Sequence, residues 1–260
     1  MNAEHFLLLT LVLARVGALV ATAPIFGTSS APLQVRVVLA AALAALVTPA
    51  QWHVAVEYPG GALSYAVLLG SEAIVGACLG LGVMILVHAM NMAGELVGFV
   101  GGLSLADAFD PGMEENVPHF ARLMFLLTIA VFLCIGGHRM VMAGLLDTFQ
   151  TIPPGSCGVP HAMADTFATL VTQSFSLAIR AAAPAVTALL LATIALGLIS
   201  RTLPQLNVMA LGFGLNAMLA FAALGLTLGA AAWAFQDQVE PALETILEAL
   251  RTPARPEWLT

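Results

Sequence analysis

The chain has 260 residues, of which 60% are hydrophobic and 9% are charged, and its formal net charge at pH 7 is −7. This composition is typical of membrane proteins, because too few polar residues are present to cover a soluble two-domain enzyme. All eight cations are arginines spread singly along an acidic chain, which excludes a basic patch for nucleic acid.

Apolar runs near the length that crosses a bilayer predict an all-α membrane protein built from long, kinked helices and helical hairpins. A cleavable signal peptide is not expected, because the first residues lack a positive region and Arg15 interrupts the first apolar run. The expected helices, in chain order, are 6–23, 33–47, 63 to about 106, 120–135, 140–149, 162–200 and 206–235.

The end of the third predicted helix carries two patterns on its surface. The first is a glycine repeat at four-residue spacing, which lets another backbone approach closely; its members are Gly94, Gly98 and Gly102. The second is a polar stripe at helical spacing, formed by His88, Asn91 and Glu95. The glycines can pack within the chain or against another subunit. The polar stripe can serve as a proton relay or, as we favour, as polar contacts to neighbouring subunits.

An acidic segment broken by proline and glycine, DAFDPGMEE, follows at residues 107–115. Irregular backbone and carboxylates occur at membrane depth only inside protein or beside water. The segment is therefore either an ordinary aqueous loop or an element held in a water-lined cavity. Arg122 is close enough in sequence to pair with its acids, or it is simply an arginine at a helix end that reaches toward water.

The last predicted element, residues 237–251, is an amphipathic helix, because Val239, Leu243, Ile246 and Leu250 recur at helical spacing beside a stripe of glutamates. It packs on its own chain or binds a partner. No sequence pattern indicates a catalytic nucleophile with its base, a phosphate-binding loop, a metal-ligand set or a cofactor site. We therefore do not expect an enzyme.

Three segments together resemble the FliR family of type III export-gate components. They are RVGALVATAPIF at 15–26, the stretch 101–155 with GLSLADAFDP, GGHR and TIPPG, and RTLPQLNVMALGF at 201–213. The resemblance runs along most of the chain in the same order. The flagellar branch is a closer match than the related virulence-secretion proteins.

The resemblance implies a structural subunit of the flagellar protein export gate, in the bacterial inner membrane at the flagellar basal body. Its implied partners are FliP, FliQ and FlhB, with unfolded flagellar proteins as substrates and membrane lipid around the complex. It further implies a single domain over 1–260, with a P-like half (about 1–150), a Q-like hairpin (about 160–236) and the C-terminal helix. Arg201, Pro204 and Gln205 lie at the tip of that hairpin.

The family resemblance also implies that the loop at about 107–118 plugs the pore, hinged at Gly101 and Gly102 and ending at Pro118. Arg122 is a candidate latch because of its closeness in sequence to the acids of the loop. The plug residues are Phe109, Asp110, Pro111, Gly112, Met113, Glu114, Glu115 and Asn116. Two alternatives remain open: an export-gate subunit of a virulence secretion system, and a proton-coupled membrane transporter that uses His88 or Glu95.

Overall fold

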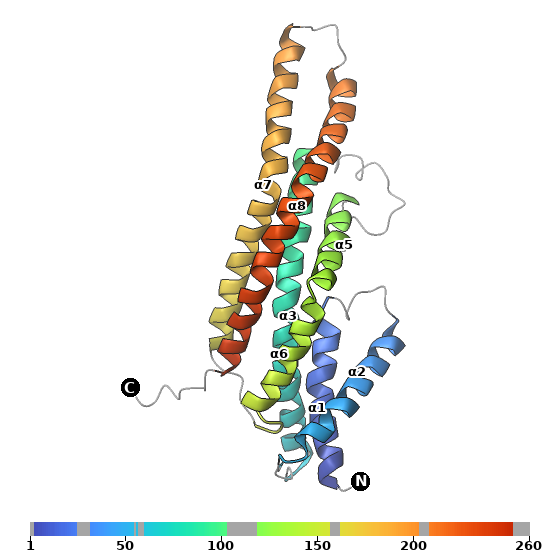
Figure 1. Ribbon diagram of the computed structural model, residues 1–260, viewed down its shortest axis with the longest axis vertical. Helices are drawn as coiled ribbons and strands as arrows, with labels where there is room; N and C mark the ends of the chain where they lie inside the picture. The colour runs from blue at the N-terminus through green and yellow to red at the C-terminus, as the bar shows by residue number, and fades with distance from the viewer. Residues whose placement is uncertain are drawn as a thin grey trace, which may run out of the picture. The chain divides into compact units, whose positions relative to one another are not determined.

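The computed structural model is built from α-helices, and no strand occurs in the part of the chain that it describes (Figure 1). The described residues are 3–24, 32–54, 56, 60–102, 119–156, 162–202 and 208–251. The helices are α1 (Ala3–Thr22), α2 (Leu33–Val47), the 3₁₀ turn η1 (Thr48–Gln51), α3 (Ala62–Val100), α5 (His119–Cys134), α6 (Gly137–Thr151), α7 (Ala162–Thr202) and α8 (Val208–Arg251). The all-α class expected from the apolar runs is confirmed.

Prolines and glycines set the helix ends. α2 begins directly after Pro32, and Pro49 lies in the first turn of η1, where α2 has already ended. Proline has no N–H to donate and its ring disfavours helix in the preceding turn, so Pro32 and Pro49 suit these helix ends. By contrast, α7 and α8 continue through Pro184 and Pro241. Gly136 precedes α6 with φ of 77°, a left-handed conformation that glycine adopts at little cost.

The third helix ends earlier than predicted. The sequence pattern predicts helix to about residue 106, but α3 ends at Val100 and the chain turns at Gly101 and Gly102. Gly102 has φ of 72°, which an α-helix cannot contain, and its N–H donates to the carbonyl of Phe99 at 3.1 Å. The glycine repeat therefore includes the residue that terminates the helix.

The described chain divides into two compact units, and α3, α7 and α8 each contribute to both. The first unit contains residues 1–85, 136–171 and 239–260, and the second contains 86–135 and 172–238.

In the first unit, α1 and α3 pack closely because α3 presents glycines to α1. A Cβ atom on Gly76 would overlap the carbonyl oxygen of Arg15, and one on Gly80 would overlap the hydroxyl of Thr22. The last part of α8 joins this core: Ile246 is fully buried and its side chain lies against Gly82. The glutamates 240, 244 and 248 of α8 are exposed. The buried and exposed faces are those indicated by the sequence spacing, but residues 237–251 continue α8 and do not form the separate helix that was predicted.

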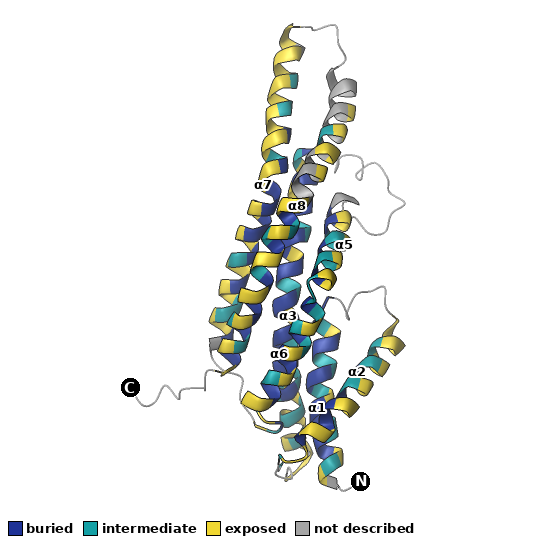
Figure 2. Ribbon diagram, viewed as in Figure 1, coloured by how far each residue is buried: buried dark blue, intermediate teal, exposed yellow. Residues whose placement is uncertain are grey.

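In the second unit, α3 approaches α5 at Gly94, where a Cβ atom would lie 2.9 Å from Cα of Ala121. Phe132 of α5 contacts Phe235 of α8, with ring centroids 6.3 Å apart. The part of α7 beyond Arg180 is mostly exposed, as the yellow ribbon shows in Figure 2.

Four described helical segments are long and apolar enough to cross a membrane, which agrees with the membrane class of the sequence. They are Glu4–Thr22, Leu33–Gln51, Ala62–Val100 and Met163–Ile199. α5 and α6, joined by a bend at Ile135 and Gly136, together make a fifth candidate.

Candidate functional site

The predicted plug loop lies outside the described residues, so its eight residues, Phe109 to Asn116, stay a prediction. The structure describes its two anchors. On one side the chain leaves α3 through the left-handed Gly102, and on the other side α5 begins at His119. The space beside Gly102 is open, because a Cβ atom added there would meet no atom within 4 Å. The backbone conformation, rather than crowding, is what requires glycine at this position.

Arg122 lies in the first turns of α5, and its side chain is exposed. No ion pair involves it within the described residues. The acids that it was expected to latch, Asp107, Asp110 and Glu115, lie outside the described residues. The latch is therefore untested. At the hairpin tip, Arg201 is exposed near the end of α7, and Pro204 and Gln205 again lie outside the described residues.

The polar stripe lies on the surface of the second unit. His88 and Glu95 are exposed and Asn91 is half-buried. The amide Nδ2 of Asn91 donates a hydrogen bond to Oε1 of Glu95 at 3.2 Å. These two side chains are four residues apart on one helix, where such pairs meet. The stripe is open to a partner or to water, and it can exchange protons or hydrogen bonds with either.

The glycines of α3 and those of α8 differ in what surrounds them. Gly94 is buried against Ala121 and Met124 of the same chain, and Gly98 is buried as well. Gly225 and Gly229 of α8 are exposed, and a Cβ atom on either would meet nothing within 4 Å. Close packing within the chain thus accounts for Gly94, whereas the glycine face of α8 is uncovered by this chain's described residues.

A buried polar cluster lies in the first unit and was not predicted from the sequence. Arg15 of α1 and Glu72 of α3 form an ion pair whose side chains are 0% and 1% exposed. The Nε and Nη2 atoms of Arg15 both lie 2.7 Å from Oε2 of Glu72. Two charges buried this deeply require partners for their remaining donors and lone pairs.

Those partners come from α6 and the turn that follows it. Arg15 Nη1 donates to the carbonyl of Thr148 at 3.0 Å, and Nη2 donates to the carbonyl of Ile152 at 3.0 Å. The backbone N–H of Gly155 donates to Oε1 of Glu72 at 2.8 Å. The guanidinium also lies 4.4 Å from the ring centre of Phe149, at a distance that allows a cation–π contact. Arg15 therefore donates to two carbonyls at the C-terminal end of α6, and the carbonyl of Thr148 also accepts from the backbone N–H of Ile152 at 2.9 Å.

A sequence signal for this pair exists. Arg15 and Glu72 each interrupt an apolar run, and intramembrane charges of opposite sign are usually paired. The signal names the two residues, but it does not say that α6 supplies the other hydrogen-bond partners.

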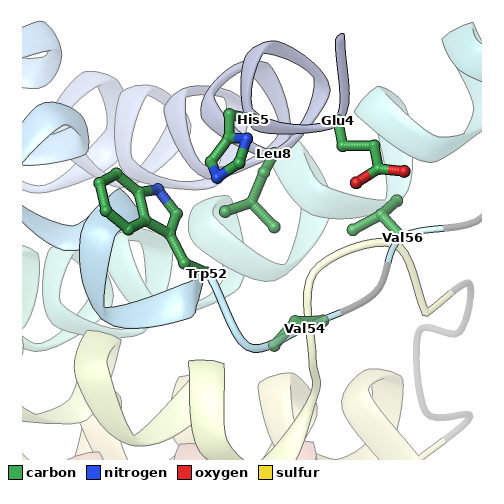
Figure 3. Close-up of a pocket in the computed structure, with 6 residues that line it drawn as sticks. All are labelled: Glu4, His5, Leu8, Trp52, Val54 and Val56. Carbon is green, nitrogen blue, oxygen red and sulfur yellow. The ribbon is translucent and has the colours of Figure 1, made fainter. Parts of the chain in front are cut away.

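A small pocket of about 90 Å³ lies in the first unit between α1 and the segment after η1. Figure 3 shows the ring of His5 turned toward Trp52, with Glu4 at the other end of the pocket beside Val56. The His5 and Trp52 rings meet edge to face, with centroids 5.2 Å apart. Nδ1 of His5 has no hydrogen-bond partner among the described residues. The volume is that of a few water molecules, so the pocket is too small for a drug-sized ligand.

No group of three or more His, Cys, Asp or Glu side chains within the described residues is arranged to hold a metal ion. The polar groups that the structure brings together in the described residues include the buried Arg15–Glu72 pair, the exposed stripe and the exposed Arg251–Asp147 pair.

Comparison with known proteins identifies relatives over most of the chain. Residues 6–242 match the family described as bacterial export proteins, family 1. The chain is 35% identical over 208 residues to the flagellar biosynthetic protein FliR of Escherichia coli K12, covering 78% of this chain and 77% of the relative. It is 30% identical over 217 residues to FliR of Bacillus subtilis, covering 81% and 82%.

A more distant relative belongs to a virulence system. The Yop proteins translocation protein T of Yersinia pestis is 28% identical over 161 residues, covering 61% of this chain and 62% of the relative. The match is weaker and shorter than the matches to the two flagellar relatives.

Proposed function

Because the chain belongs to the family of bacterial export proteins, family 1, we propose that it forms part of the channel wall of the flagellar protein export gate. The protein is a membrane component of the flagellar type III export apparatus and not an enzyme. The observation that carries the finer proposal is the similarity to the FliR proteins over about four fifths of the chain. The stronger flagellar matches favour the flagellar system over a virulence system.

The loop at about 107–118 is the closing element in this proposal. A channel that passes unfolded chains must be sealed between transport events, and the loop is acidic and hydrophilic in an otherwise apolar chain. The left-handed Gly102 supports a hinge on one side, and the start of α5 at His119 supports a fixed anchor on the other. The loop's carboxylates would stay hydrated in an aqueous lumen.

The test is deletion of residues 110–116 in cells that assemble the full apparatus. The shortened chain should still copurify with the other gate components, and the membrane should leak ions and small molecules. A matched control replaces the same seven residues with a Gly/Ser segment of equal length, which keeps the chain length but removes the acids and Pro111. A deletion variant that assembles and stays tight to ions would refute the plug.

FliP, FliQ and FlhB are the proposed neighbours, and the unfolded flagellar subunits are the proposed cargo. The open glycine face of α8 at Gly225 and Gly229 supports close contact with another subunit. The P-like half at about 1–150 and the Q-like hairpin at about 160–236 belong to this proposal too. Copurification of the tagged chain, with a mass for the complex, tests the assembly. Recovery of the chain free of all three partners would contradict it.

A proton-coupled transporter is the second candidate, and the exposed polar stripe of His88, Asn91 and Glu95 is the observation that favours it. It requires that a titratable side chain of the stripe be essential for transport.

A further inference from the structure

Each helix of the α7–α8 hairpin has a long stretch without charged residues. On α7 this stretch begins after Arg180, and no charged residue follows until Arg201. The residues between them, 181–200, rise about 30 Å as a helix, which is the thickness of the hydrocarbon core of a bilayer. On α8 no charged residue occurs between Arg201 and Asp237.

A cleft joins these two positions within the second unit. Its volume is about 380 Å³, and it is lined by side chains from one face of α7 and one face of α8. Gln173, Ser176 and Arg180 contribute from α7, and Trp233, Asp237 and Gln238 contribute from α8. The buried Leu177 and the half-buried Ala234 line it as well, so the lining combines apolar and polar side chains.

The cleft is lined by one positive and one negative side chain that do not form an ion pair with each other. Arg180 and Asp237 are both exposed and line the same cleft, yet no ion pair joins them within the described residues. Gln173 and Gln238 add amide groups that donate and accept hydrogen bonds. A ligand that carries a negative and a positive group a few ångströms apart would complement this lining.

We propose that the cleft binds the headgroup of a zwitterionic membrane phospholipid of the phosphatidylethanolamine type. The phosphate lies against Arg180, and the primary ammonium lies between Asp237 and the ring of Trp233. Arginine is suited to phosphate, and an indole face attracts an ammonium group. This inference concerns the outer surface of the hairpin and does not depend on the role of the plug loop.

The surface next to the cleft favours a lipid over a protein segment as the occupant. Beyond Arg180, α7 exposes a series of large apolar side chains that suit acyl chains: Leu190, Leu191, Ile194, Leu198 and Ile199. Figure 2 shows this part of α7 largely in the colour of exposed residues. Trp233 is 69% exposed at the cleft, and tryptophan gathers at the boundary between headgroups and hydrocarbon.

Native mass spectrometry of the full chain in detergent, with added phosphatidylethanolamine or phosphatidylglycerol, tests the proposal. Phosphatidylglycerol has the phosphate but no ammonium, so wild type should retain phosphatidylethanolamine more tightly. Arg180→Gln should weaken retention of both lipids by about tenfold, because each loses a charge-assisted hydrogen bond. Asp237→Asn should weaken only phosphatidylethanolamine and so abolish the preference.

Arg201→Gln is the matched control, because Arg201 is an exposed arginine on the same helix at the other end of the apolar stretch. It should leave the lipid preference unchanged, and far-ultraviolet circular dichroism should show equal helix content in every variant. Equal retention by wild type, Arg180→Gln and Asp237→Asn would overturn the proposal. Full competition by soluble glycerophosphoethanolamine at the lipid's own concentration would overturn it too, since the acyl chains would then contribute nothing.

A second readout uses Trp233 in the background Trp52→Phe/Trp258→Phe, which leaves one tryptophan in the chain. In vesicles of phosphatidylethanolamine and phosphatidylcholine, lipids brominated near the headgroup should quench its fluorescence more than lipids brominated near the chain ends. Stronger quenching from the chain ends, or none at either depth, would contradict a headgroup site at this position.

Discussion

The guanidinium of Arg15 lies 2.7 Å from the carboxylate of Glu72, and both side chains are completely enclosed by protein. Fifty-seven positions separate the two in sequence, and each interrupts an apolar run of its helix. Their remaining hydrogen bonds go to the end of α6 and to the turn at Gly155. The ion pair and its hydrogen bonds therefore fix the positions of α1, α3 and the end of α6 along one another.

Removal of one member of this pair should destabilise the chain strongly. Arg15→Ala leaves the Glu72 carboxylate buried without its cation, and we expect a loss of about 3–5 kcal/mol. The measurement is the thermal or denaturant stability of the detergent-purified chain. Arg15→Lys should recover only part of the loss, because an ammonium cannot reach Glu72, Thr148 and Ile152 together as the guanidinium does.

The double variant Arg15→Met/Glu72→Leu distinguishes the loss of the ion pair from the cost of leaving one buried charge without a partner. It removes both charges and keeps apolar volume, so it should be more stable than Arg15→Ala alone. If Arg15→Ala and the double variant lose the same free energy, the cost does not come from an uncompensated charge.

Replacement of Gly76 should separate α1 from α3. A Cβ atom at this position overlaps the backbone of Arg15, which cannot move aside as a flexible side chain does. Gly76→Ala should cost at least about 1–3 kcal/mol, the usual penalty for overpacking. Gly70→Ala on the same helix is the control. A Cβ atom there meets nothing within 4 Å, so helix propensity should make this variant neutral or up to about 1 kcal/mol more stable. A Gly76→Ala variant as stable as Gly70→Ala would contradict the close approach.

The second described ion pair should contribute little. Arg251 Nη2 lies 2.6 Å from Oδ2 of Asp147, but the side chains are 56% and 30% exposed. Water screens such a pair, so Asp147→Asn should change stability by less than about 1 kcal/mol. The loss should shrink further in 0.5 M salt, whereas the loss from Arg15→Ala should not. A large, salt-independent effect of Asp147→Asn would show that this pair is not a solvated surface contact.

Double replacement of His88 and Glu95 by glutamine distinguishes the two candidate functions. Both side chains are exposed, and glutamine keeps hydrogen bonding while it removes titration. The export-gate role predicts swimming motility and secretion of flagellar subunits close to wild type. Loss of export in a variant that still assembles with its partners would favour the proton relay. Asn91→Ala is the control for polar contact alone, because it removes the hydrogen bond to Glu95 without removing a titratable group.

Much of the helical framework could be predicted from the sequence, because each helix carries its own signal. Bilayer-length apolar runs predicted long helices, and the helices expected at 33–47 and 120–135 agree with α2 and α5 to within one residue at each end. The end of α3 was predicted about six residues too late. Helix periodicity continues through Gly101 and Gly102, and only the left-handed backbone of Gly102 ends it.

The sequence by itself determined the membrane class, the helix order and the family, since composition, apolar length and motif order are properties of the chain read locally. The tertiary structure alone decided which polar residues meet. Arg15 and Glu72 look like isolated charges until α1, α3 and α6 pack together, and the cleft at Arg180 and Asp237 exists only because α7 and α8 lie antiparallel. Contacts between residues far apart in the chain depend on helix register, and a local pattern does not encode that register.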